Sequence, residues 1–276
     1  MVFPPFFLMI ELQISKNKKV YFASDFHLGF PDAASSLDRE RKLVSWLESI
    51  ESNASHLFLM GDVFDFWFEY GKTVPAGFTR FLGKLAQLAD AGIQLHIFVG
   101  NHDLWMWDYF EKELNAFIYR EPTHLKLRFA ASEKNLWIGH GDGLGPGDNG
   151  YKFLKKVFTN PLAQFLFKWL HPSFGMGLAH FWSETRKMKA LSKGEDPFDE
   201  PSEFILNYIK SIQPLHEKQG LEISTYVFGH RHLPIAFPVS ENVMYYNLGE
   251  WFTSQYKNAY YLSVDEKSIQ FEPLKA

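Results

Sequence analysis

The sequence predicts an α/β fold with a helical insertion, and three observations carry this prediction. Apolar strand-like runs alternate with helix-like stretches through residues 19–99. Several of the apolar runs end in polar clusters, and ligands of open α/β sheets bind at the carboxyl ends of strands. Residues 143–200 interrupt the alternation with a helix-like segment rich in aromatic and basic residues.

The first part of the chain supplies three predicted strands and two predicted helices. The strands are KVYFAS (19–24), HLFLM (56–60) and LHIFV (95–99). Between them lie the helix-like stretches 35–50 and 75–92. Strand, helix, strand, helix, strand is an α/β pattern.

The second part places the insertion between two further strands, LWI (136–138) and STYVF (224–228). Within the insertion, YKFLKKVFTNPLAQFLFKWLHP and MGLAHFWSETRKMKALS look helical, and GEDPFDEPSE is an acidic loop. Short antiparallel strands are predicted at the end of the chain, in 234–239, 243–251, 258–264 and 268–274. The main domain is assigned to 15–276, and residues 1–14 are an N-terminal extension or an edge strand.

The composition limits the classes of function. The net charge of −4 gives no support for a nucleic-acid partner, and no obligate protein partner is indicated. The absence of cysteine excludes disulfides and thiolate–metal sites and permits a reducing cytoplasm. No apolar run reaches the roughly 20 residues that span a bilayer.

Polar side chains follow five of the strand-like runs. They are Asp25 and His27; Asp62 and Asp65; Asn101, His102 and Asp103; His140 and Asp142; and His230 and His232. One such residue after a strand is usually a turn residue or a cap, but five polar ends in one chain are hard to explain in that way. Clustered carboxylates and imidazoles need counter-charge, which metal ions supply. A donor set without sulfur favours Mn(II), Fe(II) or Zn(II) over Ca(II).

The five blocks DFH, GDVFD, GNHD, GHGD and GHRH occur in the order that is typical of the calcineurin-like metallophosphoesterases, which this chain resembles. The resemblance implies a four-layer α/β/β/α sandwich of two mixed sheets, with a dinuclear metal site at its top. One ion is expected on Asp25, His27, Asp62 and His232. The other is expected on Asp62, Asn101, His140 and His230. A hydroxide between the two ions attacks phosphorus in this family.

The same resemblance assigns catalytic roles to three more residues. His102 is expected to face the substrate as an acid or as an electrostatic partner. Asp65 and Asp103 are expected to orient metal ligands or His102 through hydrogen bonds, although Asp65 could instead cap a helix. Gly100 is expected to permit a tight turn before Asn101.

The segment GHGDGLGPGDNGYKFLKKVF resembles the bacterial UDP-2,3-diacylglucosamine hydrolases of lipid A biosynthesis. This implies cleavage of the pyrophosphate to UMP and 2,3-diacylglucosamine 1-phosphate, with 143–200 as a lid over the acyl chains. The substrate contacts implied are His102, Asp148, Tyr151, Ser183, Arg186, Lys187 and Lys189. The mixture of aromatic and basic residues also suits an anionic membrane surface, and the predicted location is peripheral, on the cytoplasmic face of the inner membrane. The alternative is a helical pair that packs ordinary aromatics onto the sheet.

His102 departs from the pattern of the lipid hydrolases, which commonly carry arginine at this position. Arginine is a permanent cation that forks onto phosphate oxygens, whereas histidine can also donate a proton. A second hypothesis is therefore a metallophosphoesterase that acts on another phosphodiester, a nucleotide or a phosphoprotein. A third, a non-enzymatic scaffold, predicts missing metal ligands, and none of the expected ligands is missing.

Overall fold

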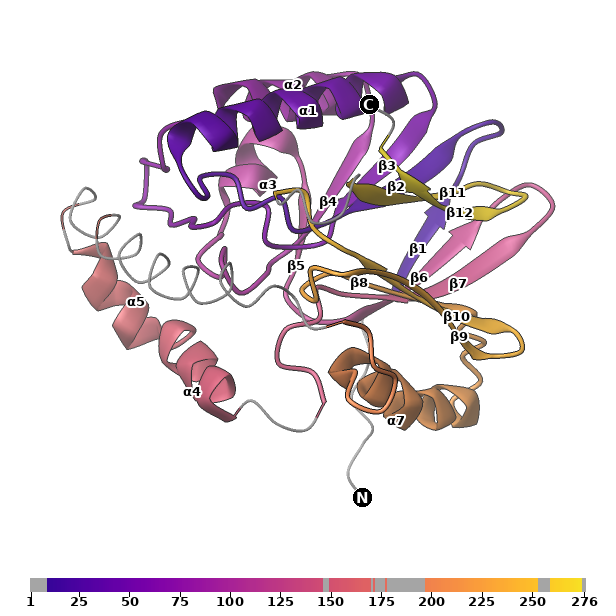
Figure 1. Cartoon of the computed structure of the whole chain (residues 1–276). Helices are drawn as coiled ribbons and strands as arrows, with labels where there is room; N and C mark the ends of the chain where they lie inside the picture. The colour runs from indigo at the N-terminus through magenta and orange to yellow at the C-terminus, as the bar shows by residue number, and fades with distance from the viewer. Residues whose placement is uncertain are drawn as a thin grey trace.

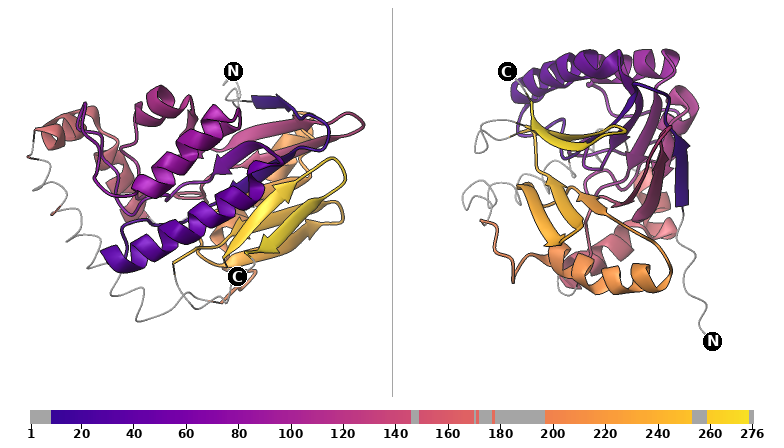
Figure 2. Two further views of the ribbon diagram at one scale, coloured as in Figure 1. Left: turned by 90° about the horizontal axis from the view of Figure 1, so that it is seen from above. Right: turned by 90° about the vertical axis from the view of Figure 1, so that its right-hand side faces the viewer.

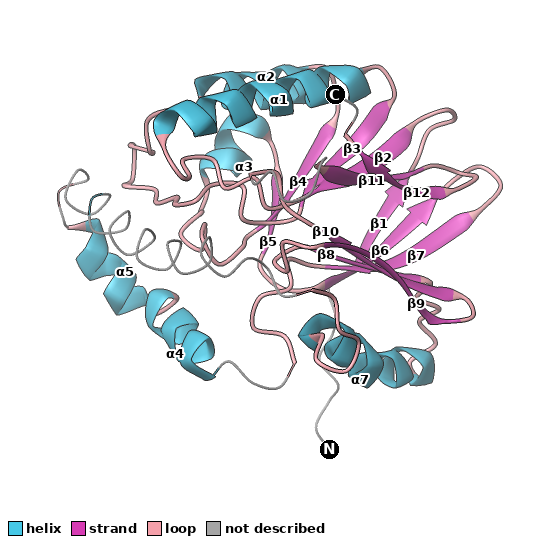
Figure 3. Cartoon of the chain, in the orientation of Figure 1, coloured by secondary structure: helices cyan, strands magenta, loops and turns pink. Residues whose placement is uncertain are grey.

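Two mixed sheets pack face to face, and helices cover their outer faces (Figure 1). The computed structural model describes residues 9–145, 149–169, 171, 177, 197–252 and 259–274. Figure 3 shows the helices in cyan and the two layers of strands in magenta. The predicted four-layer α/β/β/α sandwich is therefore confirmed.

The first sheet contains the three strands that were predicted within residues 19–99. Its order is β12 (Ile269–Pro273), β11 (Tyr260–Val264), β2 (Lys19–Ala23), β3 (Ala54–Leu59), β4 (Gln94–Phe98) and β5 (Phe117–Tyr119). Strands β2 to β5 run parallel, and β11 joins β2 in antiparallel orientation. The central strands are mostly apolar, and their last four residues are buried in each case, as expected of strands that are covered on both faces.

The helices α1 (Ala33–Glu51), α2 (Thr79–Asp90) and α3 (Tyr109–Leu114) lie on the side of the first sheet that faces away from the second. Asp32 caps α1 by accepting hydrogen bonds from the backbone N–H groups of Ala34 and Ser35, both at 2.9 Å. The second predicted helix begins at Thr79 and not at residue 75, because Phe78 has left-handed backbone geometry. Residues 75–78 belong to a loop.

The second sheet has the order β1 (Met9–Gln13), β6 (Thr123–Arg128), β7 (Glu133–Ile138), β8 (Thr225–Phe228), β10 (Val243–Leu248) and β9 (Pro234–Ser240). Helix α7 (Phe204–Lys218) covers its outer face, as the side view of Figure 2 shows. Strands β5 and β6 and helices α3 and α7 were not predicted from the sequence patterns. Three layers of apolar side chains result, one between the sheets and one beneath each helical layer.

Part of the insertion is described as two successive helices, α4 (Asn149–Phe158) and α5 (Pro161–Lys168), which follow one another nearly end to end in Figure 1. Phe167 packs against Phe68 and Trp105, with ring centroids 4.8 and 4.6 Å apart. The indole N–H of Trp105 also donates to the carbonyl of Phe158 at 2.7 Å. The α4–α5 segment is therefore fastened to the loops that follow β3 and β4. The helix expected over residues 176–192 lies outside the described residues, apart from residue 177.

Candidate metal centre

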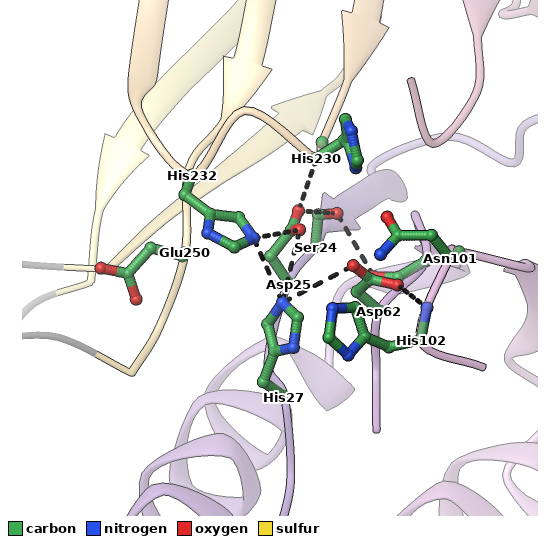
Figure 4. Close-up of polar contacts among 12 residues, drawn as sticks. Ser24, Asp25, His27, Asp62, Asn101, His102, His230, His232 and Glu250 are labelled. Atoms are coloured by element: carbon green, nitrogen blue, oxygen red, sulfur yellow. Dashed lines mark hydrogen bonds and ion pairs between the residues drawn. The ribbon is translucent and has the colours of Figure 1, made fainter. Parts of the chain in front are cut away.

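Five loops meet at the carboxyl ends of the strands and bring the predicted ligands together (Figure 4). Asp25 and His27 follow β2, Asp62 follows β3 and Asn101 follows β4. The second sheet contributes the loops after β7 and β8, which carry His140 and the pair His230 and His232. Residues up to 207 positions apart thus converge on one edge of the sandwich.

A first donor group consists of Asp25, His27, Asp62 and His232, whose ligand atoms all lie within 4.8 Å of one another. His27 Nε2 is 3.2 Å from His232 Nε2 and 3.6 Å from Asp62 Oδ2. Asp25 Oδ1 lies 3.3 Å from His232 Nε2 and 3.8 Å from His27 Nε2. These atoms surround a space of the size that one cation fills.

A second donor group, made of Asp62, His140 and His230, shares Asp62 with the first. His140 Nε2 is 3.4 Å from Asp62 Oδ2 and 3.3 Å from the amide oxygen of Asn101. The same oxygen of Asp62 therefore faces both groups, which is the arrangement required of a carboxylate that bridges two ions.

Each central carboxylate uses one oxygen for the protein and turns the other toward the donor groups. Asp25 Oδ2 accepts hydrogen bonds from the backbone N–H of His230 at 2.9 Å and from the hydroxyl of Ser24 at 2.5 Å. Asp62 Oδ1 accepts from the backbone N–H of His102 at 2.8 Å. The outward oxygen of Asp25 is buried and has no hydrogen-bond donor among the described residues. A buried anionic oxygen without a donor fits a metal ligand.

The charges of the cluster also favour bound cations. Burial raises the pKa of Asp25, but contacts with His232 and His27 outweigh it, so the pKa lies below its ordinary value. Burial lowers the pKa of His140, but the charge of Asp62 outweighs it and raises the pKa to about 10. Without metal, the carboxylates therefore recruit a proton onto His140. Divalent ions supply the same compensation and release the imidazole as a ligand.

The backbone at the centre is unusual. Of the eight described non-glycine residues with positive φ, five are proposed ligands: Asp25, His27, Asp62, His230 and His232. Such conformations are uncommon for residues with a Cβ and concentrate at functional sites. The loops thus hold these side chains in positions that an ordinary turn would not give them.

Two glycines permit the close approach of these loops. A Cβ atom on Gly100 would lie 2.2 Å from Asp62 Oδ1, and one on Gly229 would lie 2.4 Å from Asp25 Oδ2. Gly100 does not have positive φ, so the expected tight turn is not the reason for glycine here. The reason is the space that the bridging carboxylate occupies.

His102, Asp65 and Asp103 lie beside the donor groups. The ring of His102 is 4.6 Å from that of His27, and its Nδ1 is 3.0 Å from the backbone carbonyl of Asp65. Asp65 Oδ1 lies 3.6 Å from His27 Nδ1 and 3.5 Å from His102 Nδ1. Asp65 is thus placed between the two imidazoles.

Asp103 is fully buried and braces two loops. It accepts from the backbone N–H groups of Gly100 at 2.6 Å and Val63 at 2.9 Å. Burial and the charge of Asp62 raise its pKa to about 7. Asp142 pairs with Lys155 of α4 at 2.6 Å, which links this helix to the loop that carries His140.

Several predicted substrate contacts lie outside the described residues: Asp148, Ser183, Arg186, Lys187 and Lys189. Tyr151 lies in α4, but its side chain is not described.

The sequence patterns did not mark two residues that support the backbone of the ligand loops. Asn247 donates to the carbonyl of Gly229, and Arg39 donates to the carbonyl of His27. No motif marked either residue, because each acts from an element outside the five blocks.

Comparisons with known proteins agree with this geometry. Residues 18–234 match the sequence profile of the calcineurin-like phosphoesterases. The UDP-2,3-diacylglucosamine hydrolase of Porphyromonas gingivalis is 38% identical over 85% of this chain and 91% of its own length. Proteins of the same name from Pseudomonas aeruginosa and Hahella chejuensis are 25% and 26% identical, over 80% and 92% of this chain and 84% and 97% of their own lengths.

A profile match over most of the chain and a relative of this identity establish the family. The members of this family are hydrolases that use divalent metals, and the clustered Asp and His side chains provide the corresponding donors. The chain belongs to the calcineurin-like phosphoesterase family, and within it to the group of the UDP-2,3-diacylglucosamine hydrolases.

Proposed function

We propose that this protein hydrolyses the pyrophosphate bond of UDP-2,3-diacylglucosamine and releases UMP and 2,3-diacylglucosamine 1-phosphate. One observation carries the reaction class: two donor groups share a single oxygen of Asp62. The substrate follows from the identity to the Porphyromonas gingivalis hydrolase, which extends over most of both chains.

Two divalent ions, Mn(II) in the first place and Fe(II) or Zn(II) as alternatives, fit the two groups. The first would be held by Asp25, His27, Asp62 and His232, and the second by Asp62, Asn101, His140 and His230. When bound, the ions supply an acidified water and neutralise the charge on the phosphoryl oxygens. The oxygens that do not face the ions, Asp25 Oδ2 and Asp62 Oδ1, would keep their hydrogen bonds to the backbone N–H groups of His230 and His102.

His102 is proposed to contact the phosphoryl group as an acid or as an electrostatic partner. Its side chain is 28% exposed, so it can reach substrate. Its Nδ1 lies against the carbonyl of Asp65, which leaves Nε2 for the substrate. Asp65 would orient His27 and His102 together. Asp103 would act through the backbone, by holding the loops of Asp62 and Asn101 at a fixed separation.

The insertion 143–200 is proposed as a lid that receives the acyl chains. The contact of Phe167 with Trp105 fastens its helices α4 and α5 to the loops of the centre, and Lys155 pairs with Asp142. The diacylglucosamine end of the substrate would contact Asp148, Tyr151, Ser183, Arg186, Lys187 and Lys189.

We also propose that α5 contacts an anionic membrane surface on the cytoplasmic face of the inner membrane. Leu162, Phe165, Leu166 and Trp169 recur at helical spacing and are 65%, 55%, 60% and 77% exposed. Lys168 on the same helix is exposed as well. No helix within the described residues is long and apolar enough to cross a bilayer, so the contact would be peripheral.

The reaction is tested by UMP release from detergent-dispersed UDP-2,3-diacylglucosamine with Mn(II). Wild type should release UMP, and Asp62→Asn should not, because the amide carries no charge to share between two cations. Arg41→Met, a change at a 59% exposed side chain, is the matched control and should be fully active. Absence of UMP release by the folded, metal-loaded wild type would reject the proposal.

A second candidate function, hydrolysis of another phosphodiester, is favoured by one observation: His102 stands where arginine is common in the lipid hydrolases. It predicts that bis(p-nitrophenyl) phosphate is turned over as efficiently as the lipid substrate.

The membrane contact is tested separately, by sedimentation with phosphatidylglycerol vesicles. The double variant Phe165→Ser, Trp169→Ser should stay in the supernatant. Leu215→Ser, which changes an exposed residue of α7, should sediment like wild type.

A further inference from the structure

Arg39 is a buried cation next to the first donor group, and neither the five motifs nor the proposed reaction uses it. It lies in the second turn of α1, and only 4% of its surface is exposed. Burying a guanidinium is costly unless its protons are bound and its charge is balanced. Its surroundings therefore indicate what it is for.

The guanidinium binds the backbone of the turn that carries His27. One nitrogen, Nη2, donates to the carbonyl of His27 at 2.7 Å and also to the carbonyl of Phe30. The N–H of His27 donates in turn to the carbonyl of Asp62 at 2.9 Å. His27 has φ of +45°, a conformation that costs about 1–3 kcal/mol for a residue with a Cβ and needs support from its surroundings. Arg39 provides part of that support from the helix side.

The charge of Arg39 is balanced by nearby carboxylates, of which Asp65 also lies 3.6 Å from His27 Nδ1. Burial lowers its pKa to about 10, and Glu250 and Asp65 act in the opposite direction, so Arg39 is a cation at neutral pH. Its guanidinium carbon lies 5.9 Å from the centroid of the Phe252 ring. That ring packs edge to face on His27 at 4.9 Å and on His232 at 5.2 Å. Arg39 thus supports the backbone of one ligand and the aromatic wall of both.

We propose that Arg39 is a positioning residue that holds His27 in place for the first ion before that ion binds. This inference rests on the proposed function only in requiring that the two donor groups bind metal. Nothing comparable reaches the second group from Arg39, because its described contacts are with the turn 27–30 and Phe252. The effect of removing it should therefore fall on one metal site and not on the other.

The test is a calorimetric titration of the metal-free protein with Mn(II), without substrate. Wild type should bind two equivalents. Arg39→Met should bind one of them about 10–100-fold more weakly, the range for residues that orient metal ligands, and the other unchanged. Arg41→Met, two positions along the same helix and paired only with exposed Asp38 within the described part of the chain, should match wild type. A second readout is the ¹⁵N spectrum of the His27 imidazole in metal-free protein, which should broaden in Arg39→Met.

Arg39→Lys is a second variant that keeps the charge and most of the side-chain stem, but its nitrogen ends one bond short of the position from which Nη2 reaches the two carbonyls. It should weaken the same single site by several-fold. Native affinity at both sites in either folded variant would overturn the inference, and so would an equal loss at both sites. If wild type itself binds no Mn(II), the proposed metal centre fails, and that result is distinct from the failure of Arg39 alone.

Discussion

Gly100→Ala tests whether the centre depends on direct contact between the loops after β3 and β4. The added Cβ would lie 2.2 Å from Asp62 Oδ1 and 2.4 Å from the Asp62 backbone nitrogen, where ordinary contact requires 3.4 Å or more. Backbone cannot rotate away as a flexible side chain can, so the two loops must separate by about 1 Å. A misplacement of roughly 1 Å at a catalytic constellation costs on the order of 100-fold in rate.

The assay is steady-state UMP release at saturating Mn(II), together with the Mn(II) affinity of the metal-free protein. Gly100→Ala should lose about 100-fold in kcat and should bind Mn(II) more weakly, because Asp62 is the shared donor. Gly83→Ala is the matched control. Its Cβ meets no atom within 4 Å in α2, and alanine there should add up to about 1 kcal/mol of stability without changing kcat. Near-native kcat in Gly100→Ala would refute the close-approach argument.

Three further predictions concern residues outside the donor groups of the centre. Burial lowers the pKa of His56 to about 4 and of His96 to about 3, so the neutral imidazoles are fully stabilising above pH 6.5, and this stability is lost as the pH falls. Between pH 6.5 and 5 each imidazole should lower the free energy of unfolding, measured by urea denaturation, by about 2 kcal/mol. Phe167→Ala should raise KM for the lipid substrate and leave turnover of a soluble phosphodiester unchanged. Glu69→Gln should lower the melting temperature by a few degrees, since Glu69 accepts from the N–H groups of Trp107 and Asp108 at 2.8 and 2.9 Å.

Each of these has an outcome that contradicts it. His96→Phe should flatten the acid dependence, and an unchanged slope would mean that other groups titrate in its place. Equal losses of activity on both substrates in Phe167→Ala would mean that α4 and α5 serve the fold and do not contact the lipid substrate. An unchanged melting temperature in Glu69→Gln would show that the amide serves the loop as well as the carboxylate.

The sequence predicted the positions that converge because polar residues after buried strands must share one edge of the sheet. Asp25 and Asp62, which follow neighbouring strands of the first sheet, could therefore be placed together from pattern alone. His140 follows β7 of the second sheet, so its place beside them was expected only from the order of the family's motifs. Arg39 could not, because its role depends on how α1 packs over the turn 27–30, and a helical arginine has no distinguishing spacing. The role of Gly100 was also hidden, since a glycine needed for space and a glycine needed for positive φ look alike in a sequence. Helix α3 and strand β5 are too short to give a periodic signal.

Asp25 and Asp62 each use one carboxylate oxygen to hold a neighbouring ligand loop, which indicates that the protein positions the ligands before metal binds. Asp25 and Asp62 each commit one oxygen to a backbone N–H of a neighbouring ligand loop, at 2.9 and 2.8 Å. These bonds connect the loops of β2 with β8 and of β3 with β4, and they support three of the ligands with left-handed backbone, Asp25, Asp62 and His230. A preformed site pays little ordering entropy when it binds metal. Metal removal should therefore abolish activity while leaving the fold intact, unlike a domain whose ligands fold around their ion. A near-ultraviolet circular dichroism spectrum that collapses on chelation would contradict this view.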